Sequence, residues 1–314
     1  MQTTNFSHTS VLLFECIDAL NIRDGYTYVD CTAGGGGHSL EIAKRMGPTS
    51  RLICFDRDTN AIAAATERLK DYLDRVTFVN DNFSSLEQVI RDYNITNLGG
   101  VLADLGCSSH QFDTPERGFS YMHNARLDMR MDMTSPLSAY EVVNGYSEND
   151  LKRILYDYGE ERFAPRIASA ICKSRANAPI ETTHQLTDII KSAIPAAARA
   201  DGPHPAKRTF QAIRIEVNGE LDAIKPLIDA AAHGLVSGGR IAIISFHSLE
   251  DRIVKQAYKA LASGCTCPKD FPICICGRKP IIKEVSHKPI LPGEKELEEN
   301  PRSRSAKLRV AEKI

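Results

Sequence analysis

The fold is decided by a glycine-rich stretch near the N-terminus, Asp30-Cys31-Thr32-Ala33-Gly34-Gly35-Gly36-Gly37-His38-Ser39. An apolar run at residues 26–30, typical of a buried strand, leads directly into it, and a helical pattern follows from Ser39. Successive glycines let the backbone turn sharply and approach a ligand closely. A helix that begins there presents unpaired N–H groups. The stretch therefore predicts a nucleotide-like ligand at one edge of a doubly wound sheet, the alternative being a flexible glycine turn.

Four more apolar runs indicate strands, at residues 51–56, 76–80, 100–104 and 240–246. The first runs alternate with helical patterns, which predicts an α/β fold with a mostly parallel sheet and helices on both faces. The last two runs are separated by far more chain than the dozen or so residues of an ordinary crossover. Cap-like serines at 135 and 147 and periodic apolar residues indicate helices in that gap. We expect residues 1–108 and 206–314 to form the sheet domain and residues 109–205 an inserted helical domain.

Composition excludes several classes of protein. The 314 residues are 42% hydrophobic and 25% charged with a net charge of −1, which is not the profile of a disordered chain. No apolar stretch approaches the roughly 20 residues of a membrane span, and the N-terminus does not resemble a signal peptide. The nine cysteines are an odd number and mostly scattered, which favours reduced thiols and a cytoplasmic location.

Two acidic residues end strands on either side of the glycine stretch. Asp56 ends the second run, where an acid can accept hydrogen bonds from both ribose hydroxyls. Asp104 ends the fourth run. An NAD-dependent oxidoreductase is the alternative, but its fingerprint wants G-x-G-x-x-G, and here His38 stands where a small residue would pack. S-adenosylmethionine fits better, because its site needs backbone contact with a methionine moiety and a ribose-binding acid.

Several longer stretches resemble one family over nearly the whole chain. Beside the glycine stretch they are His8-Thr9-Ser10-Val11-Leu12-Leu13, Asp104-Leu105-Gly106-Cys107-Ser108-Ser109, Leu127-Asp128-Met129-Arg130-Met131, Arg208-Thr209-Phe210-Gln211-Ala212, Ser245-Phe246-His247-Ser248-Leu249-Glu250 and Asn300-Pro301-Arg302-Ser303. In these motifs the sequence resembles the RsmH (MraW) family of bacterial ribosomal RNA methyltransferases.

The resemblance implies a class I S-adenosylmethionine-dependent methyltransferase, Rossmann-like, whose inserted helical domain recognises the substrate. It implies methyl transfer to the exocyclic N4 of a cytidine in 16S ribosomal RNA, at the decoding centre of the small ribosomal subunit. The family's cofactor-binding positions fall here on Gly36, Gly37, His38, Asp56, Phe83, Asp104 and Gln111. Phe83 would cover the adenine, the alternative being a core residue. A noncatalytic RNA-binding assembly factor of the ribosome remains open as a different class of function.

The chemistry asks for a hydrogen-bond acceptor near the reacting amine. The N4 lone pair of cytosine is delocalised into the ring, so catalysis must align the nitrogen with the methyl group and stabilise developing charge. Amino-methyltransferases commonly carry Asp/Asn/Ser-Pro-Pro-aromatic after the fourth strand, and this chain departs from that pattern. Candidates are Asp104, Ser108 and Ser109, although the serines can equally satisfy a turn. His247 could take a proton, the alternative being a helix cap.

Basic clusters indicate phosphate contacts. They comprise Lys207 with Arg208, and Arg302 with Arg304, and the alternative for each is ordinary solvated surface. We also expect the helical domain to present Arg126 and Arg130 to RNA, and Phe119 or Tyr121 to stack on a base. A separate group of cysteines could bind one tetrahedral zinc, namely Cys265, Cys267, Cys274 and Cys276. The C-x-C spacing is tighter than in common zinc sites, and a loop of free thiols is the alternative. The sequence leaves monomer and homodimer open.

Overall fold

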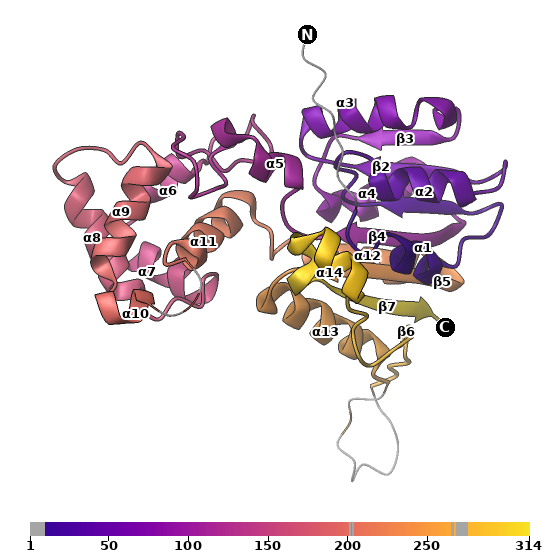
Figure 1. The fold of residues 1–314 in the computed structure, drawn as a ribbon. Coiled ribbons are helices and arrows are strands. Elements are labelled where there is room, and N and C mark those ends of the chain that lie inside the picture. The colour runs from indigo at the N-terminus through magenta and orange to yellow at the C-terminus, as the bar shows by residue number, and fades with distance from the viewer. Residues whose placement is uncertain (1–9, 201, 203, 265–266, 268–275) are drawn as a thin grey trace. The chain divides into compact units, whose positions relative to one another are not determined.

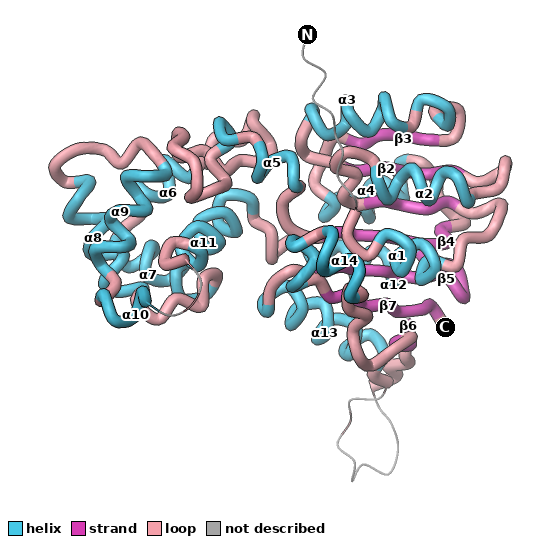
Figure 2. The backbone as a smooth tube through the Cα atoms, in the orientation of Figure 1, coloured by secondary structure: helices cyan, strands magenta, loops and turns pink. Residues whose placement is uncertain are grey.

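The computed structural model describes residues 10–200, 202, 204–264, 267 and 276–314. The chain divides into two compact units, a sheet unit (Met1–Gly106 with Leu221–Ile314) and a helical unit (Cys107–Glu220). Figure 1 follows the chain through both, and Figure 2 distinguishes their helices from their strands. No helix in the described part of the chain is both long and apolar enough to cross a membrane.

The sheet unit is built on one sheet, whose described strands follow the order β3-β2-β1-β4-β5-β7-β6. Strands β1 to β5 are parallel, whereas β7 runs antiparallel to both of its neighbours. Their bounds are β1 Thr27–Asp30, β2 Arg51–Phe55, β3 Val76–Val79, β4 Leu98–Asp104, β5 Leu235–Ser245, β6 Ile282–Glu284 and β7 Lys307–Lys313. The five apolar runs are confirmed as strands, while β6 and β7 were not predicted.

Side chains along each buried strand alternate between two apolar cores, as the two-residue repeat of a strand requires. Val29 and Val101 face the core shared with α4, α12 and α13, whereas Tyr28 and Leu102 face the core shared with α1, α2 and α3. The sheet is therefore covered on both faces (Figures 1 and 2). The helices of this unit are α1 Leu13–Leu20, α2 Gly37–Arg45, α3 Thr59–Arg68, α4 Leu86–Asp92, α12 Ile224–Gly234, α13 Ser248–Ala262 and α14 Glu294–Glu299, with short 3-10 turns η1 Lys70–Tyr72, η2 Phe83–Ser85 and η4 Pro301–Ser305.

The helical unit has its own apolar core, formed by residues such as Leu151, Ile167 and Phe210. Its described helices are α5 Ser109–Asp113, α6 Ala139–Gly145, α7 Glu148–Asp157, α8 Ala164–Arg175, α9 Thr183–Ala193, α10 Ala196–Ala200 and α11 Lys207–Asn218, with one 3-10 turn, η3 Pro115–Arg117. Ser147 caps α7 as predicted, its hydroxyl accepting the N–H of Asp150. The predicted cap at Ser135 is wrong, because Ser135 lies in a turn closed on Asp132 and the cap of α6 is Ser138.

The boundary between the units differs from the expected one. The insertion was expected to return to the sheet at residue 206. Instead α11 packs on α6 and α7, and the sheet unit resumes at Leu221. The reason is that α11 buries Phe210, Ile213 and Val217 in the helical core, so only α12 serves as the crossover before β5.

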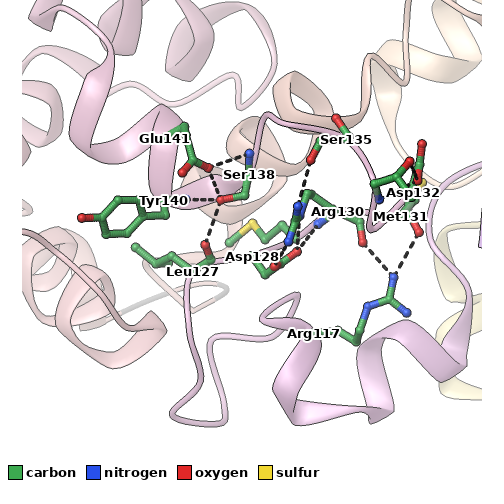
Figure 3. Close-up of polar contacts among 12 residues, drawn as sticks. Arg117, Leu127, Asp128, Arg130, Met131, Asp132, Ser135, Ser138, Tyr140 and Glu141 are labelled. Atoms are coloured by element: carbon green, nitrogen blue, oxygen red, sulfur yellow. Dashed lines mark hydrogen bonds and ion pairs between the residues drawn. The ribbon is translucent and has the colours of Figure 1, made fainter.

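A polar network shapes the Leu127–Met131 motif in the helical unit (Figure 3). The guanidinium of Arg130 donates to both carboxylate oxygens of Asp128, at 3.0 and 2.7 Å, and to the carbonyl of Ser135. Arg117 donates to the carbonyls of Arg130 and Met131, as Figure 3 also shows. These bonds satisfy the polar groups of an irregular segment without regular secondary structure.

Candidate functional site

The glycine stretch forms a tight loop from β1 into α2, held by the carboxylate of Asp30. One oxygen accepts the N–H of Thr32 and the other the hydroxyl of Ser39. Gly36 adopts φ +78°, a left-handed conformation that glycine tolerates without strain, and ends the loop as the N-cap of α2. The loop thus brings the first turn of α2 to the carboxyl edge of the sheet, as predicted.

Two glycines of the loop are required by packing within the protein. A Cβ on Gly36 would lie 3.1 Å from the Cα of Ala65, and a Cβ on Gly37 would lie 2.0 Å from Oγ of Ser10. Gly34 is different, because a Cβ there would meet nothing closer than the Thr32 carbonyl at 3.9 Å. Open space on the loop therefore lies at Gly34, while Gly36 and Gly37 allow α3 and residue 10 to come close.

Asp56 joins the loop from β2. Its Oδ2 accepts the N–H of Gly34 at 2.8 Å and its Oδ1 accepts the N–H of Asp58 at 2.9 Å. A carboxylate offers about four lone-pair positions, so two acceptor positions are left for other donors. Burial raises the pKa of Asp56 to about 6, against the effect of the two backbone hydrogen bonds.

Asp104 ends β4 beside the same loop. Its N–H donates to the hydroxyl of Thr32 at 2.7 Å, and its Oδ2 lies 4.0 Å from Nδ1 of His38. Burial raises the pKa of Asp104 well above its ordinary value, and the negative charges of Asp30, Glu250 and Glu296 act in the same direction. Its Oδ1 is buried and has no hydrogen-bond partner among the described residues.

The carboxylate oxygens of Asp56 and Asp104 fit the positive groups and hydroxyls of S-adenosylmethionine. The cofactor carries a sulfonium and an ammonium group, both positive, and two ribose hydroxyls. Asp104 offers a buried oxygen without a partner in an acidic environment, and Asp56 keeps acceptor capacity at the loop. An unpartnered buried carboxylate oxygen is costly unless a ligand supplies its hydrogen bond or charge.

Phe83 lies in η2, after β3, and is half-buried against the core of the sheet unit. Asn82 caps this turn by accepting the N–H of Ser84. The ring packs on the core and keeps part of its surface exposed. This placement is compatible with both interpretations of Phe83, a residue that covers the adenine and a core residue.

The remaining predicted residues, which follow Asp104 in the sequence, belong to the helical unit. Ser108 is the N-cap of α5, and its hydroxyl accepts the N–H of Gln111 at 3.3 Å. The buried Gln111 returns the interaction, its Oε1 accepting the N–H of Ser108 at 3.1 Å. Ser109 opens α5, and its side chain lies outside the described part of the structure. The serine thus has the local capping role that was its alternative interpretation.

Cys107 precedes this capping box and contacts Arg214 of α11. Its sulfur accepts a hydrogen bond from Arg214 at 3.2 Å. Burial raises the pKa of its thiol to about 12, so the thiol remains protonated at neutral pH. Arg214 is itself held by Glu220 through two bonds of 2.9 Å.

The predicted RNA-contacting residues differ in exposure and in the contacts that the structure describes for them. Lys207, Arg302 and Arg304 are exposed, and Arg208 is exposed but donates to the carbonyl of Glu160 at 2.7 Å. Arg126 is exposed, whereas Arg130 is half-buried and donates to Asp128 and Ser135, so its expected contact with RNA stays a prediction. Phe119 is 3% exposed in the helical core and cannot stack on a base, while Tyr121 stacks on His204 at 4.4 Å.

Two further predictions concern His247 and the cysteines. His247 caps α13, its ring accepting the N–H of Glu250, which is the capping alternative. Cys265 and Cys274 lie outside the described residues. Within the described part of the chain, no three His, Cys, Asp or Glu residues are grouped to hold a metal.

Two residues at this edge of the sheet were not predicted from the sequence. Thr32 anchors the backbone of Asp104, and the only signal was its place inside the glycine stretch. Glu296 is the second; its charge acts on Asp104, and its Oε1 accepts the N–H of Leu12 at 2.8 Å. No local pattern indicates that pairing, because the two residues are 284 positions apart in the chain.

The strand order, the antiparallel β7 and the acids around the glycine loop together define a class I S-adenosylmethionine-dependent methyltransferase fold, which confirms the predicted fold class. Comparison with known proteins narrows the class. The model of the MraW methylase family matches residues 5–314, and the chain therefore belongs to that family.

Curated relatives are similar in sequence to this chain over nearly their full length. The chain is 58% identical over 309 residues to "Ribosomal RNA small subunit methyltransferase H" of Clostridioides difficile, covering 98% of this chain and 99% of the relative. It is 54% identical over 314 residues to the protein of the same name from Brevibacillus brevis, covering both chains entirely. The family resemblance inferred from the motifs is thereby confirmed.

Proposed function

We propose that this protein transfers a methyl group from S-adenosylmethionine to the exocyclic N4 of a cytidine in 16S ribosomal RNA, at the decoding centre of the small subunit. The observation that carries the proposal is the buried oxygen of Asp104, which has no partner in the described structure and lies at the end of β4 beside the glycine loop. The names of the curated relatives support the class of RNA. A ribosomal substrate supports a cytoplasmic location.

The cofactor would be held mainly by the sheet unit. Asp56 would accept the ribose hydroxyls with the acceptor positions that Gly34 and Asp58 leave open. Phe83 would cover the adenine with its exposed surface. Asp104 would face the positive end of the cofactor, and Gly36, Gly37, His38 and Gln111 complete the set that the family resemblance assigns. When bound, S-adenosylmethionine supplies the electrophilic methyl group on a positively charged sulfur.

The residues of this chain must then align the amine and accept its N–H hydrogen bonds. Asp104 remains a candidate acceptor, because its buried Oδ1 has no partner in the described structure. The raised pKa favours the neutral carboxyl in the free protein, and the positive charge of a bound cofactor would favour the ionised form, which stabilises positive charge developing on nitrogen. Ser108 is a weaker candidate, since its hydroxyl already accepts the N–H of Gln111. The side chain of Ser109 is not described, and it stays a proposal from the sequence.

The helical unit would recognise the substrate. It exposes Lys207 and Arg208 at the start of α11, and η4 of the sheet unit exposes Arg302 and Arg304. Each suits contact with RNA phosphates. Because RNA is read largely by shape, we expect an assembled or nearly assembled small subunit to be a better substrate than naked RNA.

The test is transfer of labelled methyl from S-adenosylmethionine into small subunits that lack the modification. Incorporation at one cytidine N4, identified by mass spectrometry of the digested RNA, is the expected result. Asp104→Asn should abolish incorporation, while Asp74→Asn, a change to an exposed acid of the same unit, should not. Cofactor binding without incorporation would favour the noncatalytic assembly factor. Equal turnover on naked RNA and on subunits would contradict the expected substrate preference.

A further inference from the structure

Residues 10–12 lie directly against the glycine loop, each held by a different contact. Oγ of Ser10 occupies the space that a Cβ on Gly37 would need, at 2.0 Å. The carbonyl oxygen of Val11 lies 3.0 Å from Nε2 of His38. The N–H of Leu12 donates to Oε1 of Glu296 in α14 at 2.8 Å. Two elements far apart in the sequence, α2 and α14, thus hold one short backbone segment.

The backbone of this segment is strained. Leu12 has φ +50° and ψ +37°, the left-handed conformation, and its side chain is fully buried. That conformation is unfavourable for a residue with a Cβ, and it persists only when the surroundings enforce it. The bonds to His38 and Glu296 both hold the peptide group between Val11 and Leu12, on one side of the strained residue. On its other side the Leu12 carbonyl accepts the N–H of Cys16 at 2.9 Å, so the surroundings enforce the conformation from both sides.

The contact with Val11 fixes the chemistry of His38. A carbonyl oxygen only accepts hydrogen bonds, so Nε2 must carry the proton and Nδ1 is the bare nitrogen of the neutral ring. Nδ1 lies 4.0 Å from Oδ2 of Asp104. The side chain is buried, and burial lowers the pKa of His38, which keeps the ring neutral. Its one N–H group is therefore committed to the backbone of Val11.

We infer that His38 and Glu296 are positioning residues, which hold residues 10–12 as a wall beside the cofactor site. His38 acts through Val11 rather than by a side-chain hydrogen bond to the cofactor, and Glu296 acts through Leu12. The inference rests on the proposed function, because it takes the glycine loop and Asp104 to be the S-adenosylmethionine site. It gives the C-terminal helix α14 a role in cofactor affinity.

The first experiment separates the hydrogen bond of Glu296 from its charge. Glu296→Gln keeps an oxygen acceptor for the N–H of Leu12, whereas Glu296→Ala removes it. We expect calorimetry to show S-adenosylmethionine binding about tenfold weaker in the alanine variant and within about threefold of wild type in the glutamine variant. The control is Glu298→Ala, an exposed acid of the same helix, with no change. Alanine binding like wild type, or glutamine as weak as alanine, would overturn the inference.

The second experiment uses two amides in place of His38. A glutamine at 38 can place its N–H₂ group near the position of Nε2, whereas an asparagine is too short to reach Val11. We expect His38→Gln to bind S-adenosylmethionine nearly as wild type does, and His38→Asn to bind about tenfold more weakly. Hydrogen exchange at Leu12 in the free protein should be faster in His38→Asn and in Glu296→Ala.

The double variant and the wild type complete the test. His38→Asn with Glu296→Ala should lose less affinity than the two single changes added together, because both act on the same segment. Fully additive losses with unchanged exchange at Leu12 would mean that the two residues act separately, against the inference. Wild-type protein that does not bind S-adenosylmethionine would overturn the proposed function itself, whereas wild-type binding with unaffected variants would overturn this inference alone.

Discussion

The hydroxyl of Ser39 donates a hydrogen bond to Oδ2 of Asp30 over 2.6 Å, and both residues are completely buried. Asp30 ends β1 and Ser39 lies in the first turn of α2, so the bond joins the two elements that flank the glycine loop. The other oxygen of Asp30 accepts the N–H of Thr32, inside the loop. One carboxylate therefore fixes the path of the loop from both ends.

Removing that hydroxyl should destabilise the protein. Ser39→Ala leaves a buried carboxylate with one donor fewer, and we expect the free energy of unfolding to fall by about 1.5–3 kcal/mol. Urea denaturation measures this loss. Ser192→Ala is the matched control, because the hydroxyl of Ser192 bonds only its own helix at the surface, and the change should stay within about 0.5 kcal/mol. Equal stability of the Ser39 variant and wild type would show that this bond does not fix the loop.

The strands around this loop could be predicted because buried parallel strands are continuous apolar runs. Strand β7 was not predicted, since Lys307–Lys313 is neither a continuous apolar run nor a strict alternation, and the charged Arg309 interrupts its apolar residues. In the structure Arg309 is buried through an ion pair with Asp251 at 2.6 Å, so a charged residue belongs to the interior. Such pairing between distant elements has no signal in a single sequence.

The domain boundary at helix α11 could not be predicted for a similar reason. Its apolar periodicity indicates a buried face but does not say which core receives it, and Phe210 packs in the helical core. At the site, Asp56 and Asp104 were predictable because they end parallel strands, whose carboxyl ends share one edge of the sheet. The segment at residues 10–12 was not, because its partner Glu296 comes from the other end of the chain.

Cofactor binding should depend on pH through Asp56. Its pKa is raised to about 6, and the ionised carboxylate is the form that accepts ribose hydroxyls. Binding should therefore release protons near pH 6, and affinity for S-adenosylmethionine should fall as the pH drops below about 6, approaching tenfold per unit from this group. Calorimetry in buffers of different ionisation enthalpy counts the protons. Asp56→Asn should weaken binding and flatten the pH dependence, and unchanged affinity would remove Asp56 from the site.

The same shift affects stability in the opposite sense. A raised pKa means that the folded state binds more protons than the unfolded state between about pH 4 and 6. The contribution of Asp56 to the free energy of unfolding is therefore highest at acid pH and declines as the pH rises through that window. We expect Asp56→Asn to remove that decline from the pH profile of the cofactor-free protein. A profile identical to that of wild type would contradict the assignment.

Breaking the ion pair of Arg214 and Glu220 should lower the free energy of unfolding more than replacing both residues by apolar ones. Both side chains are largely buried and make two bonds of 2.9 Å. Glu220→Gln leaves the guanidinium without its counter-charge, and we expect a loss of about 3 kcal/mol in urea unfolding. Replacing the pair by Arg214→Met with Glu220→Leu should recover most of that loss, because two apolar side chains need no partner. A double variant less stable than Glu220→Gln would show that the pair is needed for more than charge balance.

Lys207 offers the cleanest test of RNA contact by the helical unit. It is exposed at the start of α11, whereas its neighbour Arg208 donates to the carbonyl of Glu160, so a change at Arg208 would also disturb the fold. Lys207→Ala should weaken binding to small subunits and lower the slope of log affinity against log salt by about 0.7–0.9, the value for one phosphate contact. Affinity for S-adenosylmethionine should not change. Lys173→Ala, which removes an exposed lysine from α8 of the same unit, is the control and should leave the slope as it is. An unaltered slope in the Lys207 variant, or an equal drop in both variants, would mean that this end of α11 does not contact the RNA.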